Sequence, residues 1–359
     1  MVTADLKETF LSIVRLGIGN DLTVRKPEKI DWDALEALAT QHGLSAILVD
    51  GVEKLPENQR PPRILLLQWI GESMRDYKCR YDQYRKAISN LAAFYNSHSY
   101  KMMVLKGFAC SLDWPKPEHR PCGDIDIWLF GKQKEADAIL TKEKGIEIDN
   151  RHHHHSVFYW HDFMVENHYD FVNVHHHKSN ADFERILKRL GEDDSHSIEL
   201  YDEKIYLPSP NLHALFLLKH LMIHFAAERT SIRQLLDWGF FVKAHGKEVE
   251  WTFVTSVLER FGLKELFDIF NAICVEDLGF DTMIFPRIQF SPLLKDRVVN
   301  EMLSPEFGEQ LPKKLIPRVI FKFRRWTGNA WKHELCYKES MWSAFRSGVK
   351  NHLLKPSSI

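Results

Sequence analysis

Hydrophobic residues recur at three- and four-residue steps through the first part of the chain. The stretch 33–40 carries this spacing, and residues 64–95 continue it for many turns, with Trp69 and Leu91 among the apolar positions. Because such spacing places apolar side chains on one face of a helix, the sequence predicts a helical N-terminal region over residues 1–100.

The pattern then changes to short apolar runs bounded by polar or turn-forming residues, which is typical of strands. These runs lie at residues 102–105, 125–130, 156–160 and 171–175. The intervals 108–114 and 132–144 have room for helices between them. Strands interleaved with helices predict an α/β core over residues 101–205.

Helical spacing returns after Pro208. Pro210 suits a first helical turn, and the apolar residues that follow cover one broad side of a helix. Further helices are predicted at residues 231–244, 251–261 and 263–273, with a Pro- and Asp-rich loop at 280–292. Residues 206–359 are therefore predicted to form a helical C-terminal domain.

Charge is divided unevenly along the chain. The 359 residues include 48 Lys and Arg against 49 Asp and Glu, a formal charge of −1, but segment 313–359 alone carries +9 and leaves −10 upstream. Disordered and fibrous classes are excluded by the 44% hydrophobic content. Cations alternate with Phe321, Phe323 and Trp326 in this basic tail. That pattern fits a docked helix, RNA stacking or contact with an anionic membrane, and spacing does not decide among them.

The chain has no pattern of a signal peptide or a membrane-spanning helix. Its most apolar stretch, residues 212–227, is interrupted by His213, Lys219, His220 and His224. The five cysteines are far apart, and none forms a CxxC pair, which indicates reduced thiols. These features predict a cytoplasmic protein.

Two aspartates lie at the start of the second predicted strand. Residues two apart in a strand point to the same face, so Asp124 and Asp126 would present adjacent carboxylates while Ile125 and Ile127 face the core. Adjacent carboxylates repel each other unless a cation lies between them, and hard oxygen ligands suit Mg²⁺. By itself such a pair is more often a solvated strand edge than a metal site.

Features that suit phosphate surround this pair. Lys106 and Gly107 close the first strand and open a short helix, where free N–H groups and the positive end of the helix dipole favour anions. Gly123 would let a phosphate chain approach the backbone closely.

The combination of Leu-Lys-Gly at 105–107 with Arg-Pro-Cys-Gly-Asp-Ile-Asp at 120–126 resembles the DNA polymerase beta-like nucleotidyltransferase superfamily. It resembles in particular a bacterial family of uncharacterised nucleotidyltransferases. The resemblance extends over most of the chain and includes His224, with Arg233 and Asp237 in the downstream Arg-x-x-x-Asp pattern. By itself, the Arg233 and Asp237 pair could equally be an ordinary helical ion pair.

The resemblance implies an α+β fold: a small mixed sheet flanked by helices, with an N-terminal helical cap and a C-terminal helical domain. It implies transfer of a nucleoside monophosphate from a nucleoside triphosphate to an acceptor, with two Mg²⁺ ions held by Asp124 and Asp126. Lys106 and Gly107 stand where many members have Gly-Ser. The residues expected to contact the nucleotide or its phosphates are Lys106, Gly107, Arg120, Gly123, His224, Arg233 and Asp237.

The superfamily's third carboxylate, usually on a later strand and commonly just before a His, is harder to assign. The matching place in the predicted strand 171–175 is Asn173, which can coordinate a metal but cannot accept a proton. Glu166 and Asp170 are nearby substitutes, although Asp170 would point to the other face. Either another group such as His175 acts as the base, or catalysis is impaired and the protein only binds nucleotide.

Nine of the 19 histidines lie between residues 152 and 177. One interpretation is a zinc or nickel site, which would make this a His-rich zinc protein. The other is that the imidazoles line the nucleotide cleft. Because no Cys partners or helical His spacing accompany them, the sequence favours the second interpretation.

Overall fold

The computed structural model describes residues 3–20, 30–152, 154–174, 177, 179–227, 230–307 and 312–343. Chain contacts divide it into two compact units, each built from separate parts of the sequence. Unit 1 comprises Met1–Ile70, Leu218–Lys243 and Trp251–Met341, and unit 2 comprises Gly71–Leu217, Ala244–Glu250 and Trp342–Ile359. The division into 1–100, 101–205 and 206–359 stays a prediction.

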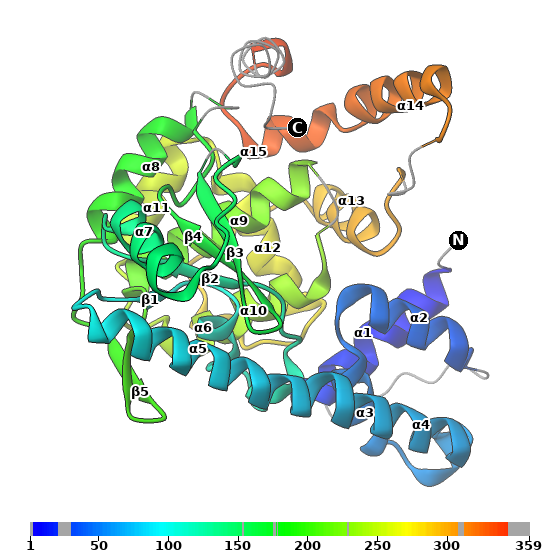
Figure 1. The fold of residues 1–359 in the computed structure, drawn as a ribbon. Coiled ribbons are helices and arrows are strands. Elements are labelled where there is room, and N and C mark those ends of the chain that lie inside the picture. Colours follow the sequence, from blue (N-terminus) through cyan, green and yellow to red (C-terminus); the bar gives the residue numbers. More distant parts are fainter. Residues whose placement is uncertain are drawn as a thin grey trace. The chain divides into compact units, whose positions relative to one another are not determined.

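Unit 2 contains a mixed sheet of six strands in the order β3-β4-β2-β1-β6-β5 (Figure 1). The strands are β1 (Met103–Val104), β2 (Ile125–Trp128), β3 (His155–Trp160), β4 (Phe163–His168), β5 (Ser197–Leu200) and β6 (Glu203–Tyr206). The β2–β4 and β1–β6 pairs are parallel, and the other neighbours are antiparallel. This confirms the predicted small mixed sheet.

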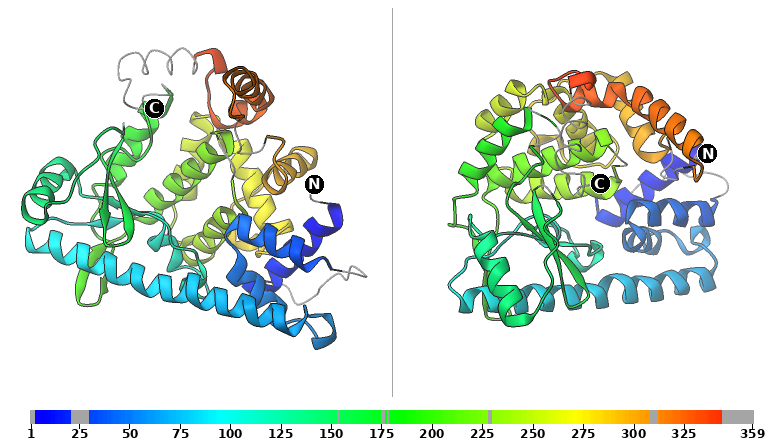
Figure 2. Two further views of the ribbon diagram at one scale, coloured as in Figure 1. Left: turned by 45° about the vertical axis from the view of Figure 1, so that its right-hand side comes forward. Right: turned by 45° about the horizontal axis from the view of Figure 1, so that its top comes forward.

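Helices α5 (Arg80–Ser97) and α7 (Gln133–Lys144) cover one face of the sheet. Figures 1 and 2 show α5 crossing the strands on this side of the sheet. Ile125, Ile127 and Val165 are buried on this face against α5 and α7, as the two-residue period of a strand requires. The next residues along β2 and β4 therefore point to the opposite face, where polar side chains gather.

Two shorter helices complete this part of the fold. The four-residue helix α6 (Phe108–Ser111) follows β1, and α8 (Ser179–Leu190) follows the β3–β4 hairpin. The helices predicted at 108–114 and 132–144 are thereby confirmed as α6 and α7.

Unit 1 is helical. Its N-terminal part consists of α1 (Ala4–Ile18), α2 (Trp32–His42), α3 (Ser45–Glu53) and most of α4 (Arg63–Ser73). A π-helical segment (Met74–Cys79) joins α4 to α5 without a break in the helical ribbon. The helical N-terminal region predicted from periodicity is confirmed.

The later helices include the predicted ones that begin at Pro210 and that cover residues 231–244, 251–261 and 263–273. They are α9 (Pro210–Ala227), α10 (Ile232–His245), α11 (Trp251–Arg260), α12 (Lys264–Glu276), α13 (Pro292–Leu303), α14 (Leu315–Gly328) and α15 (Ala330–Cys336). The predicted loop 280–292 is irregular apart from a short 3₁₀ turn at Thr282–Ile284. None of the helices in the described residues is long and apolar enough to cross a membrane.

One strand prediction is wrong. Residues 171–175 form no strand in their described part, and β4 lies earlier because His161, at a φ of 53°, turns β3 directly back into a hairpin. Phe171 and Val172 are buried, but their backbone N–H groups donate to the Glu184 carboxylate instead of to a neighbouring strand. Apolar composition alone could not separate this buried loop from a strand.

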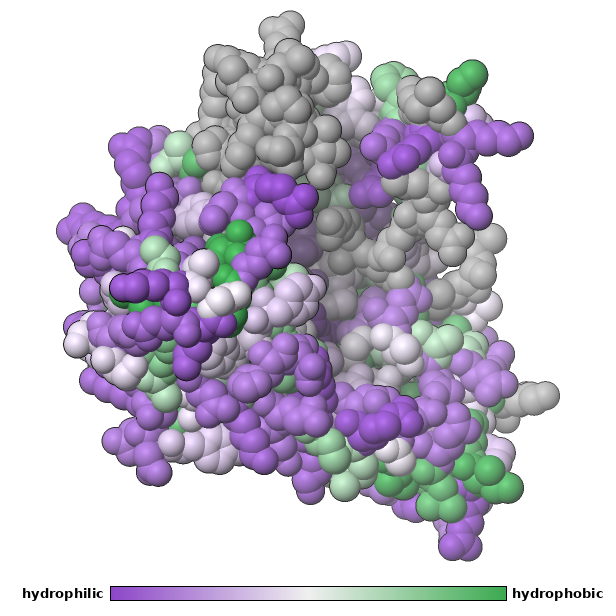
Figure 3. Space-filling view, viewed as in Figure 1, coloured by the Kyte–Doolittle hydropathy of each residue, from purple (hydrophilic) through white to green (hydrophobic). Residues whose placement is uncertain are grey.

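The described part of the basic tail behaves in two ways. In α15, Trp331 packs edge-on against Phe225 with ring centroids 5.6 Å apart, and buried Lys332 binds Glu301. On α14, by contrast, large apolar side chains are exposed, and Figure 3 shows separate hydrophobic groups among hydrophilic ones in this region. The exposed apolar side chains are Ile316, Ile320 and Phe323. The prediction that the basic tail docks on the protein therefore holds for α15, whereas this side of α14 is exposed.

Candidate active site

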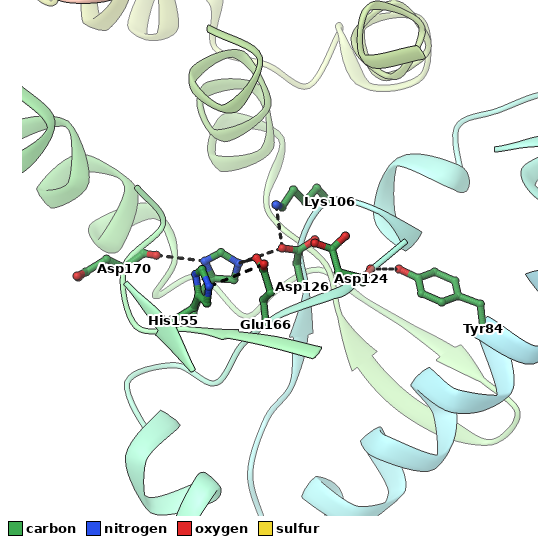
Figure 4. A network of polar contacts seen from close by, with 8 residues as sticks. Tyr84, Lys106, Asp124, Asp126, His155, Glu166 and Asp170 are labelled. Atoms are coloured by element: carbon green, nitrogen blue, oxygen red, sulfur yellow. Dashed lines mark hydrogen bonds and ion pairs between the residues drawn. The ribbon is translucent and has the colours of Figure 1, made fainter. Parts of the chain in front are cut away.

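Strand pairing brings four polar residues together on the face of the sheet away from α5 and α7. The parallel β2–β4 register sets Asp126 opposite Glu166. The antiparallel β3–β4 register sets His155 opposite His168. Directly opposed residues point to the same face, and Figure 4 shows the carboxylates of Asp126 and Glu166 gathered there with the Lys106 side chain.

The two carboxylate oxygens of Asp126 have different surroundings. The side chain is 1% exposed, and Oδ1 lies 2.9 Å from Lys106 Nζ and 3.0 Å from His168 Nε2. Oδ2 is buried without a hydrogen-bond partner among the described residues. Burial opposes ionisation, but the Lys106 ammonium and His168 outweigh it and hold the pKa of Asp126 well below its usual range. Asp126 is therefore an ionised carboxylate with one oxygen unused.

His168 is held on both ring nitrogens. Nδ1 lies 3.2 Å from the Asp170 carbonyl oxygen, and Nε2 faces both Asp126 Oδ1 and, at 3.5 Å, Glu166 Oε2. Burial lowers the pKa of His168, but its hydrogen bonds with the two carboxylates raise it to about 9. The imidazole fixes the orientation of both carboxylates.

Glu166 carries a second ionised carboxylate. Burial raises its pKa, but the hydrogen bond from His168 prevails and leaves the pKa lower than usual. Its Oε1 lies 3.8 Å from His155 Nε2. Burial dominates at His155 and lowers the pKa of its imidazole to about 4.

Asp124 is positioned through its backbone. The Tyr84 hydroxyl, on α5, donates a hydrogen bond to the Asp124 carbonyl oxygen at 2.7 Å. Gly107 adopts a φ of 59°, and a Cβ there would lie 2.8 Å from Tyr84 Oη, so glycine is required for both conformation and space. The nearby Asp126 charge, followed by burial, raises the pKa of the Asp124 carboxyl. Like-charge repulsion of this kind is relieved when a cation binds.

A buried polar network supports these strands from the other face of the sheet. On α7, Asp137 Oδ2 accepts a hydrogen bond from Ser156 of β3 at 2.6 Å, and Oδ1 accepts one from Asn167 of β4 at 2.8 Å. Asn167 lies between Glu166 and His168 in β4. The network therefore fixes α7 to β3 and β4, the strands that carry His155, Glu166 and His168.

Glu166, not Asn173, lies on a strand opposite Asp126, and the metal-ligand role expected of Asn173 stays a prediction. The strand position expected for Asn173 belongs to Glu166, because β4 ends at His168. Asn173 follows the strand, where its backbone carbonyl accepts a hydrogen bond from Asn180 Nδ2 at 2.7 Å. Asp170 contributes its backbone carbonyl to His168, and its carboxylate pairs with Lys188. His175 lies outside the described residues, so its role as a base stays a prediction.

The predicted phosphate-binding residues divide between the two units. In unit 2, Lys106 and Gly107 adjoin the cluster, and a Cβ at exposed Gly123 would meet nothing within 4 Å. Arg120 is buried and donates to the Pro121 carbonyl.

The other three belong to unit 1. His224 lies on α9, with its ring centroid 4.3 Å from that of His220, and Arg233 and Asp237 lie on α10. Their contact with a nucleotide stays a prediction.

Sequence reasoning missed His168 and Tyr84 and ranked Glu166 behind Asn173. The sequence did contain a signal for His168 and Glu166. Phe163, Val165 and Asn167 alternate with these two residues, and a carboxylate just before a His is the pattern that the family resemblance implies. No sequence signal pointed to Tyr84, because an aromatic residue in an apolar helical stripe is normally interpreted as part of the hydrophobic core.

The donor set fits a hard divalent cation. The ligand atoms of Asp126, Glu166 and His168 all lie within 4.8 Å of one another, and the partnerless buried oxygen of Asp126 is an acceptor that no described protein group satisfies. A carboxylate oxygen in this state is costly without a cation. Asp126 and Glu166 could therefore hold a hard cation such as Mg²⁺, and Asp124 lies beside Asp126 (Figure 4).

A family model described as uncharacterised nucleotidyltransferase matches residues 28–278 of the chain. Among solved structures, an antigenic nucleotidyltransferase-like protein from Paracoccidioides brasiliensis is similar, with 13% sequence identity and a TM-score of 0.36. The match covers 57% of this chain and 97% of that protein's chain. No curated protein matches.

Proposed function

Because the chain belongs to the uncharacterised nucleotidyltransferase family, we propose that it transfers a nucleoside monophosphate from a nucleoside triphosphate to an acceptor and releases pyrophosphate in a Mg²⁺-dependent reaction. The observation that carries this proposal is the buried, ionised Asp126 with a partnerless Oδ2 directly opposite Glu166. Such an oxygen can coordinate a metal ion that also binds a triphosphate.

The residues of the cluster take separate roles in this proposal. Asp124, Asp126 and Glu166 hold the Mg²⁺, which when bound neutralises the triphosphate and favours in-line attack on its α-phosphorus. His168 and Lys106 donate to Asp126 Oδ1 and so keep Oδ2 turned toward the ligand. They are positioning residues in this scheme.

Glu166 weighs against the alternative of a catalytically impaired nucleotide binder. That alternative rested on an amide, Asn173, where a carboxylate was needed. Glu166 is an ionised carboxylate in register with Asp126, so it can complete the metal shell or accept a proton from an acceptor hydroxyl. His175 stays a second candidate for the base.

The nucleotide is proposed to bind beside Gly107, Arg120 and Gly123, where open space adjoins Gly123. His224, Arg233 and Asp237 are proposed as further nucleotide contacts, on the strength of the family pattern alone. The acceptor is a nucleophile of unassigned class.

The test is pyrophosphate release from each of the four common nucleoside triphosphates, measured with Mg²⁺ across a panel of hydroxyl-bearing acceptors. The proposal predicts release by the wild type and its loss in the double variant Asp124→Ala, Asp126→Ala. A matched control, Asp193→Ala with Asp194→Ala, removes two acids from an exposed loop of the same unit and should retain activity. Nucleotide-dependent thermal stabilisation without turnover across the panel would instead support the binding-only alternative.

A further inference from the structure

Three imidazoles lie against one another beside the carboxylate cluster. The ring centroids of His154 and His155 are 4.3 Å apart, those of His155 and His168 are 5.4 Å apart, and those of His154 and His168 are 6.0 Å apart. One ligand nitrogen from each residue lies within 4.8 Å of the other two.

The backbone holds these residues in place independently of their side chains. His155 and His168 are register partners in the β3–β4 hairpin. The carbonyl oxygen of His154 accepts hydrogen bonds from the backbone N–H groups of Tyr169 and Asp170 at 3.0 and 3.1 Å. The three imidazoles are therefore anchored to one hairpin, as a preformed site requires.

Two nitrogens in this group have no hydrogen-bond partner among the described residues. They are Nδ1 of His154 and Nδ1 of His155, both buried, and the whole His155 residue is 7% exposed. A buried polar atom without a partner costs on the order of 1–3 kcal/mol. Two such atoms on adjacent residues beside a third imidazole are an uncommon arrangement unless a ligand completes it.

The outer contacts of the group match those of metal-bound imidazoles. A ligating histidine usually gives its other ring nitrogen to a carboxylate or a backbone carbonyl. His155 Nε2 faces Glu166 Oε1 at 3.8 Å, and His168 Nδ1 faces the Asp170 carbonyl oxygen at 3.2 Å. His155 Nδ1 is left to face a shared ion, whereas His168 Nε2 would have to leave Asp126 Oδ1, which it contacts at 3.0 Å, to bind that ion.

We propose that His154, His155 and His168 form a binding site for a divalent transition metal of the Zn²⁺ class, distinct from the Mg²⁺ site of the carboxylates. Imidazole nitrogens prefer such borderline ions to Mg²⁺. Tetrahedral zinc with bonds of about 2.0–2.1 Å needs ligand nitrogens roughly 3.4 Å apart. The present separations of up to 4.8 Å exceed that value, so binding requires the three imidazoles to move closer together. His168 Nε2 would serve either this ion or Asp126 Oδ1, so binding of the ion would remove one of the two donors to that oxygen.

The test measures metal binding directly, by titrating tag-free, metal-stripped full-length protein with Zn²⁺ in a calorimeter and by recording the visible absorption of bound Co²⁺. The proposal predicts one tight site with the intense absorption of tetrahedral cobalt. Because loss of even an outer-shell partner weakens metal binding about 10–100-fold, His154→Gln and His155→Gln should each weaken it at least tenfold. Circular dichroism checks that each variant is folded.

Two controls address the other histidines. His161→Gln changes an exposed imidazole at the hairpin turn, and the triple change His175→Gln, His176→Gln, His177→Gln removes the second histidine run. Both should leave the tight site intact. Absence of a tight site, or its loss in the triple variant with retention in folded His154→Gln, would overturn the proposal. The measurement requires no turnover, so its failure is distinguishable from failure of the proposed nucleotidyl transfer.

Discussion

Asp126 shows how a single side chain can be prepared for a ligand. Both donors that reach it, Lys106 and His168, bind the same oxygen, Oδ1. The pair keeps the carboxylate ionised in a buried position and fixes its rotation. The consequence is that Oδ2 remains buried without a partner among the described residues, although buried carboxylate oxygens are normally satisfied.

Glu166 is predicted to be essential where Asn173 is not. Glu166→Gln keeps the size of the side chain but removes the charge opposite Asp126. We expect a loss of at least about 100-fold in kcat/KM, equivalent to about 2.7 kcal/mol, measured by steady-state pyrophosphate release. Asn173→Ala, which keeps the backbone carbonyl that Asn180 binds, should stay within a few-fold of wild type. The reverse order of effects would return the third-ligand role to Asn173.

Glu184 should make stability depend on pH. Burial raises its pKa from 4.5 to about 7, despite hydrogen bonds from the N–H groups of Phe171 and Val172. A carboxyl whose pKa is raised on folding stabilises the fold fully below its unfolded pKa, and this contribution is lost as the pH rises through the folded value. Relative to Glu184→Gln, which cannot ionise, the wild type should therefore lose up to about 3 kcal/mol between pH 4.5 and pH 8.

Chemical unfolding followed by circular dichroism at several pH values measures this difference. Glu192→Gln, at an exposed position near the end of the same helix, provides the control and should show no such trend. A wild-type minus Glu184→Gln difference that is constant with pH would contradict the assignment.

At the scale of elements, α1 and α3 pack with their backbones almost in contact. A Cβ at Gly51 would lie 2.3 Å from the Ile13 carbonyl oxygen, and one at Gly17 would lie 2.4 Å from that of Ile47. Each glycine thus meets the backbone of the other helix, which cannot move aside as a flexible side chain could. The crossing depends on both residues being glycine.

Gly51→Ala is therefore expected to reduce the free energy of unfolding by about 2–3 kcal/mol, as overpacking of a tight contact does. Gly71→Ala is the matched control, because it lies on the exposed side of helix α4 with nothing within 4 Å of its Cβ. Alanine there should be neutral or stabilise by up to about 1 kcal/mol. Thermal unfolding of both variants measures the contrast, and equal effects would refute close helix packing as the cause.

Helices were predictable from sequence because each long one carries its own apolar period. The stripes that produce α10 and α11 are visible without any partner, and α9 is a long, almost continuously apolar run. Strands of four to six residues carry less information: β5 and β6 were missed, and β4 was replaced by the apolar run at 171–175. Whether such a run pairs with a neighbour or closes on a side chain such as Glu184 depends on contacts distant in sequence.

The candidate site was also predictable only in part. Asp124 and Asp126 were found because they share one short segment, and the buried state expected of Ile125 and Ile127 is confirmed. His168 could not be found in this way, because its importance follows from the β2–β4 and β3–β4 registers. Strand register is set by the hairpin turn and by the whole sheet.

At the scale of the whole molecule, acidic and basic charge are separated along the chain. The −10 balance of residues 1–312 includes the carboxylate cluster, whereas the +9 segment begins at residue 313. Within that segment, α14 combines Arg318, Lys322 and Arg324 with exposed Ile316 and Phe323.

The most direct test of the central claim compares two labels on the same triphosphate. Nucleotidyl transfer moves the α-phosphorus to the acceptor and releases the γ-phosphorus in pyrophosphate, so the account predicts acceptor labelling from α-labelled but not from γ-labelled substrate. This labelling should require Mg²⁺ and disappear in the Asp124→Ala, Asp126→Ala variant. Labelling from the γ-position, or α-labelling that survives the double substitution, would contradict it.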